Sequence, residues 1–192
     1  MSKNKKKKGR ESSAKLSPEG YIRKKARSLP IHECLINTEW DESGMAQIIV
    51  ARKHVNENVT LGLFLVDLYC LGVKDTFYQF NISTIEYEEL KSRYLEGLET
   101  EECDYTLAHN IIYGAVAFAE DFGFQPHKDF NRTTQYILEE DNEDIEMIDI
   151  EFGLNGKPCA VSSPHSDINP VVSQLEKTAG PGNYDVIYLD EY

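Results

Sequence analysis

The stretch MAQIIVARKHVNENVTLGLFLVDLYCL, residues 45–71, carries the clearest structural signal in the chain. Residues 45–54 and 59–71 are dominated by apolar and β-branched side chains, and the polar tetrapeptide 55–58 separates them. This pattern predicts two strands joined by a hairpin. Because the second run is apolar at both odd and even positions, we expect it to be a central strand, buried on both faces of a sheet.

The flanking sequence predicts further strands, a turn at 41–44 and a series of helices. Residues 31–37 and 76–80 are short β-rich runs on either side of the hairpin. Helices are expected over 83–98, 104–122, 129–138 and 167–179, the first of them behind the capping box Ser83-Thr84-Ile85-Glu86. A second hairpin, 145–152 with 157–161, is expected around the turn Asn155-Gly156, and 184–192 is a candidate edge strand.

Strands that precede helices, rather than alternating with them, indicate the α+β class. We expect one α+β domain, with a mostly antiparallel sheet of about five to six strands and about three to four packed helices, plus a disordered N-terminal tail. Residues 1–16 have almost no apolar content, whereas Ser17-Pro18-Glu19 is a good helix start. The predicted boundaries are a disordered basic tail at 1–17, a basic amphipathic linker helix at 18–29 and the domain at 30–192.

Charge divides the chain sharply. Residues 1–28 hold 11 Lys and Arg and 2 acids, a net charge of +9, and the other 164 residues hold 9 Lys and Arg and 31 acids, a net charge of −22. A basic tail attracts nucleic acid, anionic lipid or an acidic protein, whereas the acidic body repels nucleic acid. The residues expected to contact nucleic acid are Lys5, Lys6, Lys7, Lys8, Arg10, Arg23, Lys24 and Arg27.

Composition and motifs disfavour several classes of protein. No apolar run is long enough to span a bilayer, and no apolar core of a signal peptide follows the basic start, so we expect a soluble cytoplasmic protein without a membrane span. The four cysteines form no CxxC motif, so reduced thiols are expected. No Walker, GxSxG or GxGxxG pattern occurs, no metal motif can be assigned and no cofactor is evident.

Asp67 is the first candidate for chemistry, since a carboxylate inside an apolar strand is costly unless it is paired. It is either a metal ligand or general base, or, as we favour, a structural partner of Lys74 or of backbone near Gly72. His109 and Tyr113 lie one turn apart on the polar side of the helix predicted at 104–122. They either line a groove or belong to an ordinary half-buried polar face.

Two loops are the remaining candidates. Asp121, His127 and Asp129 could converge for divalent-metal or acid–base chemistry, or Asp129 could cap the next helix and His127 the preceding one. The acidic stretch 139–144 lacks the pattern of an EF-hand loop. It is a solvated loop, a docking surface for a basic partner, or a docking surface for the protein's own tail.

Three functional hypotheses follow. The leading one is a non-enzymatic binding module whose tail contacts nucleic acid or a ribonucleoprotein, without sequence specificity, while the acidic body contacts a protein partner. The alternative is a metal-dependent hydrolase, such as a nuclease, in which Asp67, Asp75, His127 and Asp129 surround a divalent ion near His109 or Tyr113. The third is an acidic inhibitor or antitoxin-like protein that mimics nucleic acid. The tail itself is an outward anchor, a segment docked on residues 139–144, or an inert extension.

Overall fold

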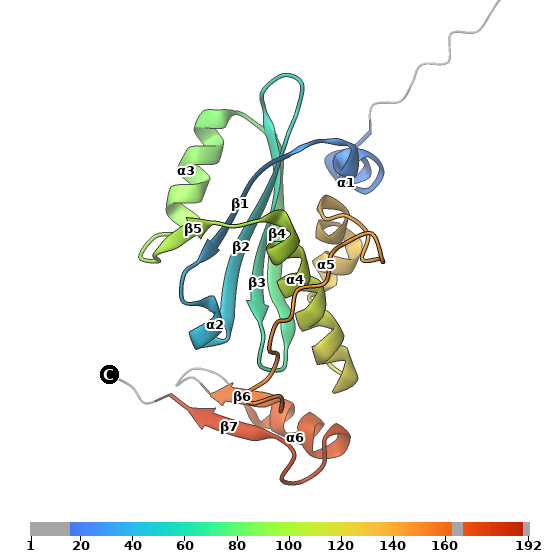
Figure 1. Ribbon diagram of the computed structural model, residues 1–192. Coiled ribbons are helices and arrows are strands. Elements are labelled where there is room, and N and C mark those ends of the chain that lie inside the picture. The colour runs from blue at the N-terminus through green and yellow to red at the C-terminus, as the bar shows by residue number, and fades with distance from the viewer. Residues whose placement is uncertain (1–15, 163–166, 190–192) are drawn as a thin grey trace, which may run out of the picture.

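A computed structural model describes residues 16–162 and 167–189 of the chain. A five-stranded antiparallel sheet lies at its centre, with the strand order β4-β3-β2-β1-β5 (Figure 1). The strands are β1 (Ile31–Asn37), β2 (Met45–Lys53), β3 (Val59–Asp67), β4 (Gly72–Ile82) and β5 (Thr100–Glu102). The predicted α+β class with a mostly antiparallel sheet is confirmed.

The hairpin predicted from residues 45–71 forms the middle of the sheet. β2 and β3 pair in unbroken register from Met45 opposite Asp67 to Lys53 opposite Val59. β3 also pairs with β4, so it is an interior, buried strand, as its double-sided apolar pattern indicated. It ends at Asp67 rather than at residue 71 because the Asp67 carboxylate accepts the backbone N–H groups of residues 69–71, which folds them into a turn.

One face of the sheet is covered by α4 (Tyr105–Asp121), α5 (Lys128–Arg132), the 3-10 helix η2 (Thr134–Ile137) and α1 (Pro18–Lys25), as Figure 1 shows. Alternate residues of the strands face these helices and form the main core. Its buried side chains include Ile48, Val50, Phe64, Ile111, Ile112, Ala115 and Phe130. The predicted helix at 129–138 is therefore two short pieces, α5 and η2, because Thr133 between them leaves the helical conformation.

The basic helix at the N-terminal end is packed into this main core. Ser17 caps α1 by accepting the N–H of Gly20 at 3.1 Å, and Pro18 is its first residue, as the sequence indicated. Ile22 in α1 and Ala26 in the 3-10 helix η1 (Ala26–Ser28) are 1% and 0% exposed. The segment we treated as a linker thus contributes side chains to the core of the domain.

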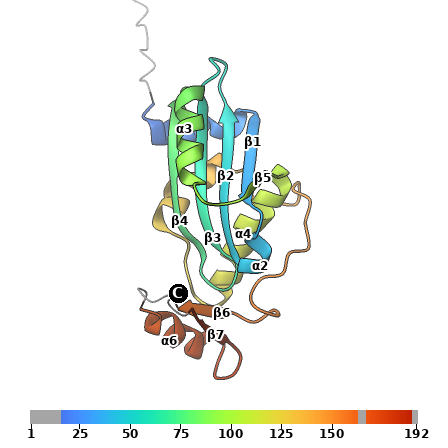
Figure 2. The same ribbon diagram turned by 90° about the vertical axis from the view of Figure 1, so that its left-hand side faces the viewer.

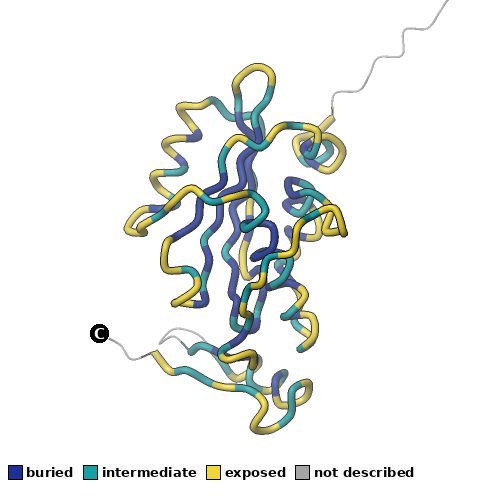
Figure 3. Tube along the Cα trace, viewed as in Figure 1, coloured by how far each residue is buried: buried dark blue, intermediate teal, exposed yellow. Residues whose placement is uncertain are grey.

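α3 (Thr84–Tyr94) lies on the opposite face of the sheet, and Figure 2 shows it in front of the strands and running along them. The predicted capping box is present, with Ser83 and Glu86 bonded to each other's backbone N–H. Tyr87 and Leu90 of α3 pack on Ile49, Leu61 and Leu63 to form a second core. The sheet is therefore sandwiched between helices, and the dark blue strands in Figure 3 show how much of it is buried.

In the C-terminal part the helix predicted at 167–179 and the strand candidate at 184–192 form, as α6 (Asn169–Thr178) and β7 (Asp185–Tyr188), whereas the predicted hairpin does not. β6 (Cys159–Ser162) and β7 pair in parallel, and α6 connects them at one end of the main sheet (Figure 1). The hairpin expected between 145–152 and 157–161 was wrong: its Asn155-Gly156 turn forms, closed by a single bridge between Leu154 and Lys157. Residues 145–152 form no strand, and the Asn110 side chain bonds the backbone of Glu146 and Ile148 on one edge.

Two short features complete the fold. The turn expected at 41–44 is the one-turn helix α2 (Trp40–Ser43), which ends at Gly44 in the left-handed conformation, at φ 66°. Within the residues that the structure describes, no helix is both long and apolar enough to cross a membrane.

Candidate functional site

The cations of α1 and η1 fall into two groups. Lys24 and Lys25 are exposed and make no ion pair within residues 16–162 and 167–189. Arg23 is exposed as well, and its guanidinium lies 5.5 Å from the centroid of the Tyr136 ring, within cation–π range. These three side chains are therefore presented to solvent by a helix whose apolar side is fixed in the core.

Arg27, by contrast, is engaged by the body of the protein. Its Nε donates to the carbonyl of Leu138 at 2.7 Å, and its Nη1 lies 2.5 Å from Glu140 Oε1. Of the cations expected to contact nucleic acid, Arg27 is thus docked on the start of the acidic loop, whereas Arg23 and Lys24 are exposed. Lys5, Lys6, Lys7, Lys8 and Arg10 lie outside the described residues.

Arg52 is a central residue that the sequence analysis missed. It is 1% exposed, and its guanidinium donates to the carbonyls of Ile137 at 2.6 Å and Leu29 at 2.5 Å. Its Nη2 also lies 2.6 Å from Glu139 Oε1. The available signal was strand parity, because Arg52 falls on the same face of β2 as Ile48 and Val50. A charge at a core-facing position calls for fixed partners.

An aromatic cluster lies beside α1. The ring centroids of Tyr21 and Phe80 are 5.2 Å apart, those of Tyr21 and His54 5.6 Å, and those of His54 and Phe80 5.9 Å. All three side chains are half-buried. Burial lowers the pKa of His54, which favours the neutral ring at neutral pH. Aromatic rings beside cations are the combination on which unpaired bases stack.

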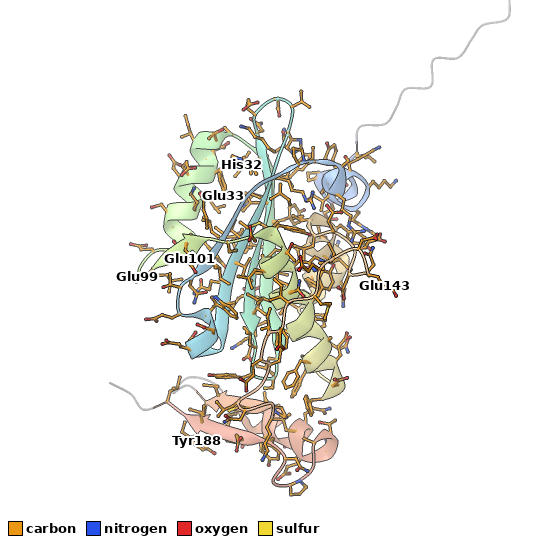
Figure 4. The ribbon with its side chains drawn as sticks, in the orientation of Figure 1. His32, Glu33, Glu99, Glu101, Glu143 and Tyr188 are labelled. Carbon is orange, nitrogen blue, oxygen red and sulfur yellow. The ribbon has the colours of Figure 1, made fainter. Side chains whose placement is uncertain are left out.

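The acidic loop 139–144 is only partly engaged. Its first two acids, Glu139 and Glu140, pair with Arg52 and Arg27. Asp141, Glu143 and Asp144 are exposed and have no cationic partner in the part of the chain that the structure describes, and Figure 4 shows Glu143 at the outer edge of the molecule. The two functions foreseen for this loop, binding a basic partner and binding the protein's own tail, use these three acids and remain predictions.

His109 and Tyr113 meet inside the protein. Their ring centroids are 4.6 Å apart, His109 is 1% exposed, and its Nε2 has no hydrogen-bond partner among the described residues. Desolvation lowers the pKa of His109, so the buried ring is neutral at neutral pH. The neighbouring Tyr105 hydroxyl accepts the N–H of Glu139 at 2.6 Å. These three aromatic rings therefore lie next to the segment around Glu139, which Arg52 and Arg27 also bind.

Asp67 has the surroundings of a structural carboxylate. Its Oδ1 accepts the N–H groups of Tyr69 and Cys70 at 2.9 Å and that of Leu71 at 3.3 Å, and Lys74 Nζ lies 3.9 Å from its Oδ2. Burial raises the pKa of Asp67, and the three backbone bonds and Lys74 oppose that shift. Burial also raises the pKa of the neighbouring Cys70 thiol above its usual range, which keeps that thiol protonated.

The 121–129 loop brings together a different set of residues from the one anticipated. His127 Nδ1 lies 3.9 Å from Asp129 Oδ2 and 4.0 Å from Asp75 Oδ1, whereas Asp121 is exposed and makes no contact with them. His127 itself caps α5 by accepting the N–H of Asp129 at 3.4 Å, a role we had given to Asp129. No group of three or more His, Cys, Asp or Glu side chains within 16–162 and 167–189 is arranged to hold a metal ion.

Comparison with known proteins identifies no relative. No family model matches the chain, and neither a curated protein nor a solved structure matches it significantly.

Proposed function

We propose that this protein is a binding module whose N-terminal basic segment contacts nucleic acid, while its acidic body contacts a protein partner. The observation that carries the proposal is the way α1 packs against the core and leaves its cations exposed. Ile22 and Ala26 fix the helix in the core, Arg23, Lys24 and Lys25 are exposed on it, and its Tyr21 belongs to an aromatic cluster with Phe80. A fixed cationic helix next to a stacking surface suits single-stranded nucleic acid, since phosphates bind the cations and bases stack on the rings.

The separation of charge supports the same reading. The cations of residues 1–28 sit on a body whose net charge is −22, so a polyanion would approach this one region and be repelled elsewhere. The docking of Arg27 on Glu140 and of Arg52 on Glu139 neutralises the first two acids of the loop 139–144. That arrangement lowers the repulsion which the acidic loop would exert on a phosphate bound at α1.

The experiment measures binding of a fluorescein-labelled oligouridylate to the full chain as salt is varied. In the test variant Lys24→Gln/Lys25→Gln, two exposed phosphate contacts are lost, so the slope of log K against log salt should become shallower by about 1 to 2. The control variant Lys157→Gln/Lys177→Gln removes the same charge from exposed positions elsewhere. Equal slopes for the two variants would refute a role for α1, and absence of binding by the unaltered chain would refute the nucleic-acid proposal.

Substitution is preferable to deletion in this test. Removal of residues 1–28 would also remove Ile22 and Ala26 from the main core and Arg27 from Glu140. A loss of binding after that deletion would confuse unfolding with loss of contact. Lys24 and Lys25 are exposed side chains without ion pairs in the described residues, so their replacement leaves the fold intact.

A further inference from the structure

Two adjoining hollows lie along residues 146–151. Their volumes are about 510 Å³ and about 530 Å³, and they share Leu107 and Ile148 in their walls. The apolar and aromatic lining residues are Trp40, Tyr105, Leu107, Ile148 and Ile150. The acidic lining residues are Asp41, Glu42, Asp104, Glu146, Asp149 and Glu151. No lysine or arginine lines either hollow, and we call the two together the acidic groove.

The backbone beside the acidic groove is held from one side only. Asn110 Nδ2 donates to the carbonyl of Glu146 at 2.9 Å, and Asn110 Oδ1 accepts the N–H of Ile148 at 3.1 Å. A single amide thus bonds two residues that are two positions apart, which is the spacing along one edge of a strand. The alternating burial of residues 147–152 agrees with an extended backbone.

The other edge of this extended segment is unpaired. Within the residues that the structure describes, the N–H groups of Met147, Asp149 and Glu151 make no hydrogen bond. An unpaired edge of this kind is a template on which an extended peptide can add as a further strand. The residue pattern favoured strand pairing here, and the chain supplies no partner strand for it among the residues described.

We propose that residues 146–151 and the acidic groove bind an extended segment of a partner protein in which Lys or Arg alternates with apolar residues. Backbone pairing would use Met147, Asp149 and Glu151. The partner's basic side chains would meet the rim acids, and its apolar side chains would pack on Trp40 and Leu107. The acidic side chains of the groove require a positively charged partner segment. The apolar side chains of its lining require apolar residues between the partner's basic residues. This inference deepens the protein-partner half of the proposed function.

The chain's own tail is a poorer fit to the groove. The run Lys3-Asn4-Lys5-Lys6-Lys7-Lys8 has the charge but no apolar side chain for the lining residues. A separate protein with apolar residues between its cations satisfies both parts of the groove. Occupation by the tail is therefore an outcome that the experiment must be able to detect.

The test titrates the full chain with the peptide Lys-Val-Lys-Val-Lys-Val-Lys and follows the fluorescence of Trp40, which is the single tryptophan and lines the groove. Saturable binding with a change in Trp40 emission is expected. The variant Asp149→Lys/Glu151→Lys should bind about tenfold or more weakly at low salt, because two rim charges reverse. The control Glu89→Lys/Glu96→Lys makes the same charge change at exposed sites elsewhere, and its affinity should stay within about twofold of the unaltered chain.

Two further measurements separate this mode from simple charge attraction. Hydrogen exchange of the amides of Met147, Asp149 and Glu151 should slow when the valine peptide binds, because these amides would then donate hydrogen bonds to the peptide backbone. A serine-for-valine peptide of equal charge should bind more weakly. Equal affinity of the test and control variants, equal affinity of the two peptides, or unchanged exchange at these amides would overturn the proposal.

The tail and the nucleic-acid proposal are tested separately in the same chain. If the variant Lys5→Gln/Lys6→Gln/Lys7→Gln/Lys8→Gln alters Trp40 emission before any peptide is added, the tail occupies the groove and the partner proposal is overturned. Peptide binding that persists in Lys24→Gln/Lys25→Gln supports the acidic groove whatever the result with oligouridylate. The nucleic-acid proposal is therefore tested by the lysine variant of α1, and the peptide-binding proposal by the variant of the acidic groove.

Discussion

Replacing Arg52 by alanine should destabilise the protein by about 3–5 kcal/mol, because two buried carbonyl acceptors lose hydrogen bonds from a charged donor. Arg52 makes two short hydrogen bonds to the carbonyls of Ile137 and Leu29, each worth about 1.5–3 kcal/mol when the donor is charged. The pair with Glu139 adds little to this sum, because the Glu139 side chain is 40% exposed and water can solvate its carboxylate. The backbone carbonyls have no such replacement and supply most of the loss.

The assay is urea unfolding followed by circular dichroism, with the free energy of unfolding extrapolated to water. Lys53→Ala is the matched control, because Lys53 is the next residue of β2 and its pair with Glu57 is exposed; it should cost less than about 1 kcal/mol. Arg52→Lys keeps the charge but not the planar fork and should give an intermediate loss, which remains measurable if the alanine variant does not fold. A cost for Arg52→Ala no larger than that of Lys53→Ala would refute the reasoning.

Two further predictions concern the other buried polar groups. Because burial lowers the pKa of His109 below the ordinary value of about 6.5, folding disfavours its proton, so stability should be full above that pH and decline as the pH falls. His109→Gln should reduce this decline in unfolding experiments across the acidic range, and parallel pH profiles for the two proteins would contradict the assignment. Asp67→Ala should cost about 2–4 kcal/mol because three backbone N–H groups lose their acceptor, whereas Asp67→Asn retains an oxygen and should cost about half as much. Equal unfolding free energies for Asp67→Ala and the unaltered protein would show that the carboxylate has another purpose.

Local patterns in the sequence were sufficient for much of the fold. The apolar runs of residues 45–71 predicted the β2–β3 hairpin, and the double-sided pattern identified β3 as central. The Ser83 capping box and the Ser17-Pro18 start marked where α3 and α1 begin. Each of these signals depends on residues that are close in the chain, because strand alternation, helix periodicity and caps are satisfied by near neighbours.

Contacts between distant residues could not be predicted in this way. Asn155-Gly156 turned the chain as expected, yet the segment before it did not pair with residues 157–161, and the side chain of the distant Asn110 bonds two of its backbone groups instead. Likewise, His127 lies beside Asp75, 52 positions earlier in the chain, rather than beside Asp121. The sequence had identified residue types suited to chemistry, and the tertiary structure decided which of them meet.

The sequence by itself determined the α+β class, the central hairpin and the separation of a basic end from an acidic body. Only the tertiary structure decided that the basic helix is mounted on that body, with Ile22 in the core and Arg27 on Glu140. It also brought Arg52 into hydrogen-bond contact with Ile137, which lies 85 positions later in the chain. Finally, it left one backbone edge of residues 146–151 unpaired among the described residues. The physical reason is that composition and periodicity report a residue's own preferences, whereas the partner of a buried charge or an open backbone edge is set by the way distant segments pack.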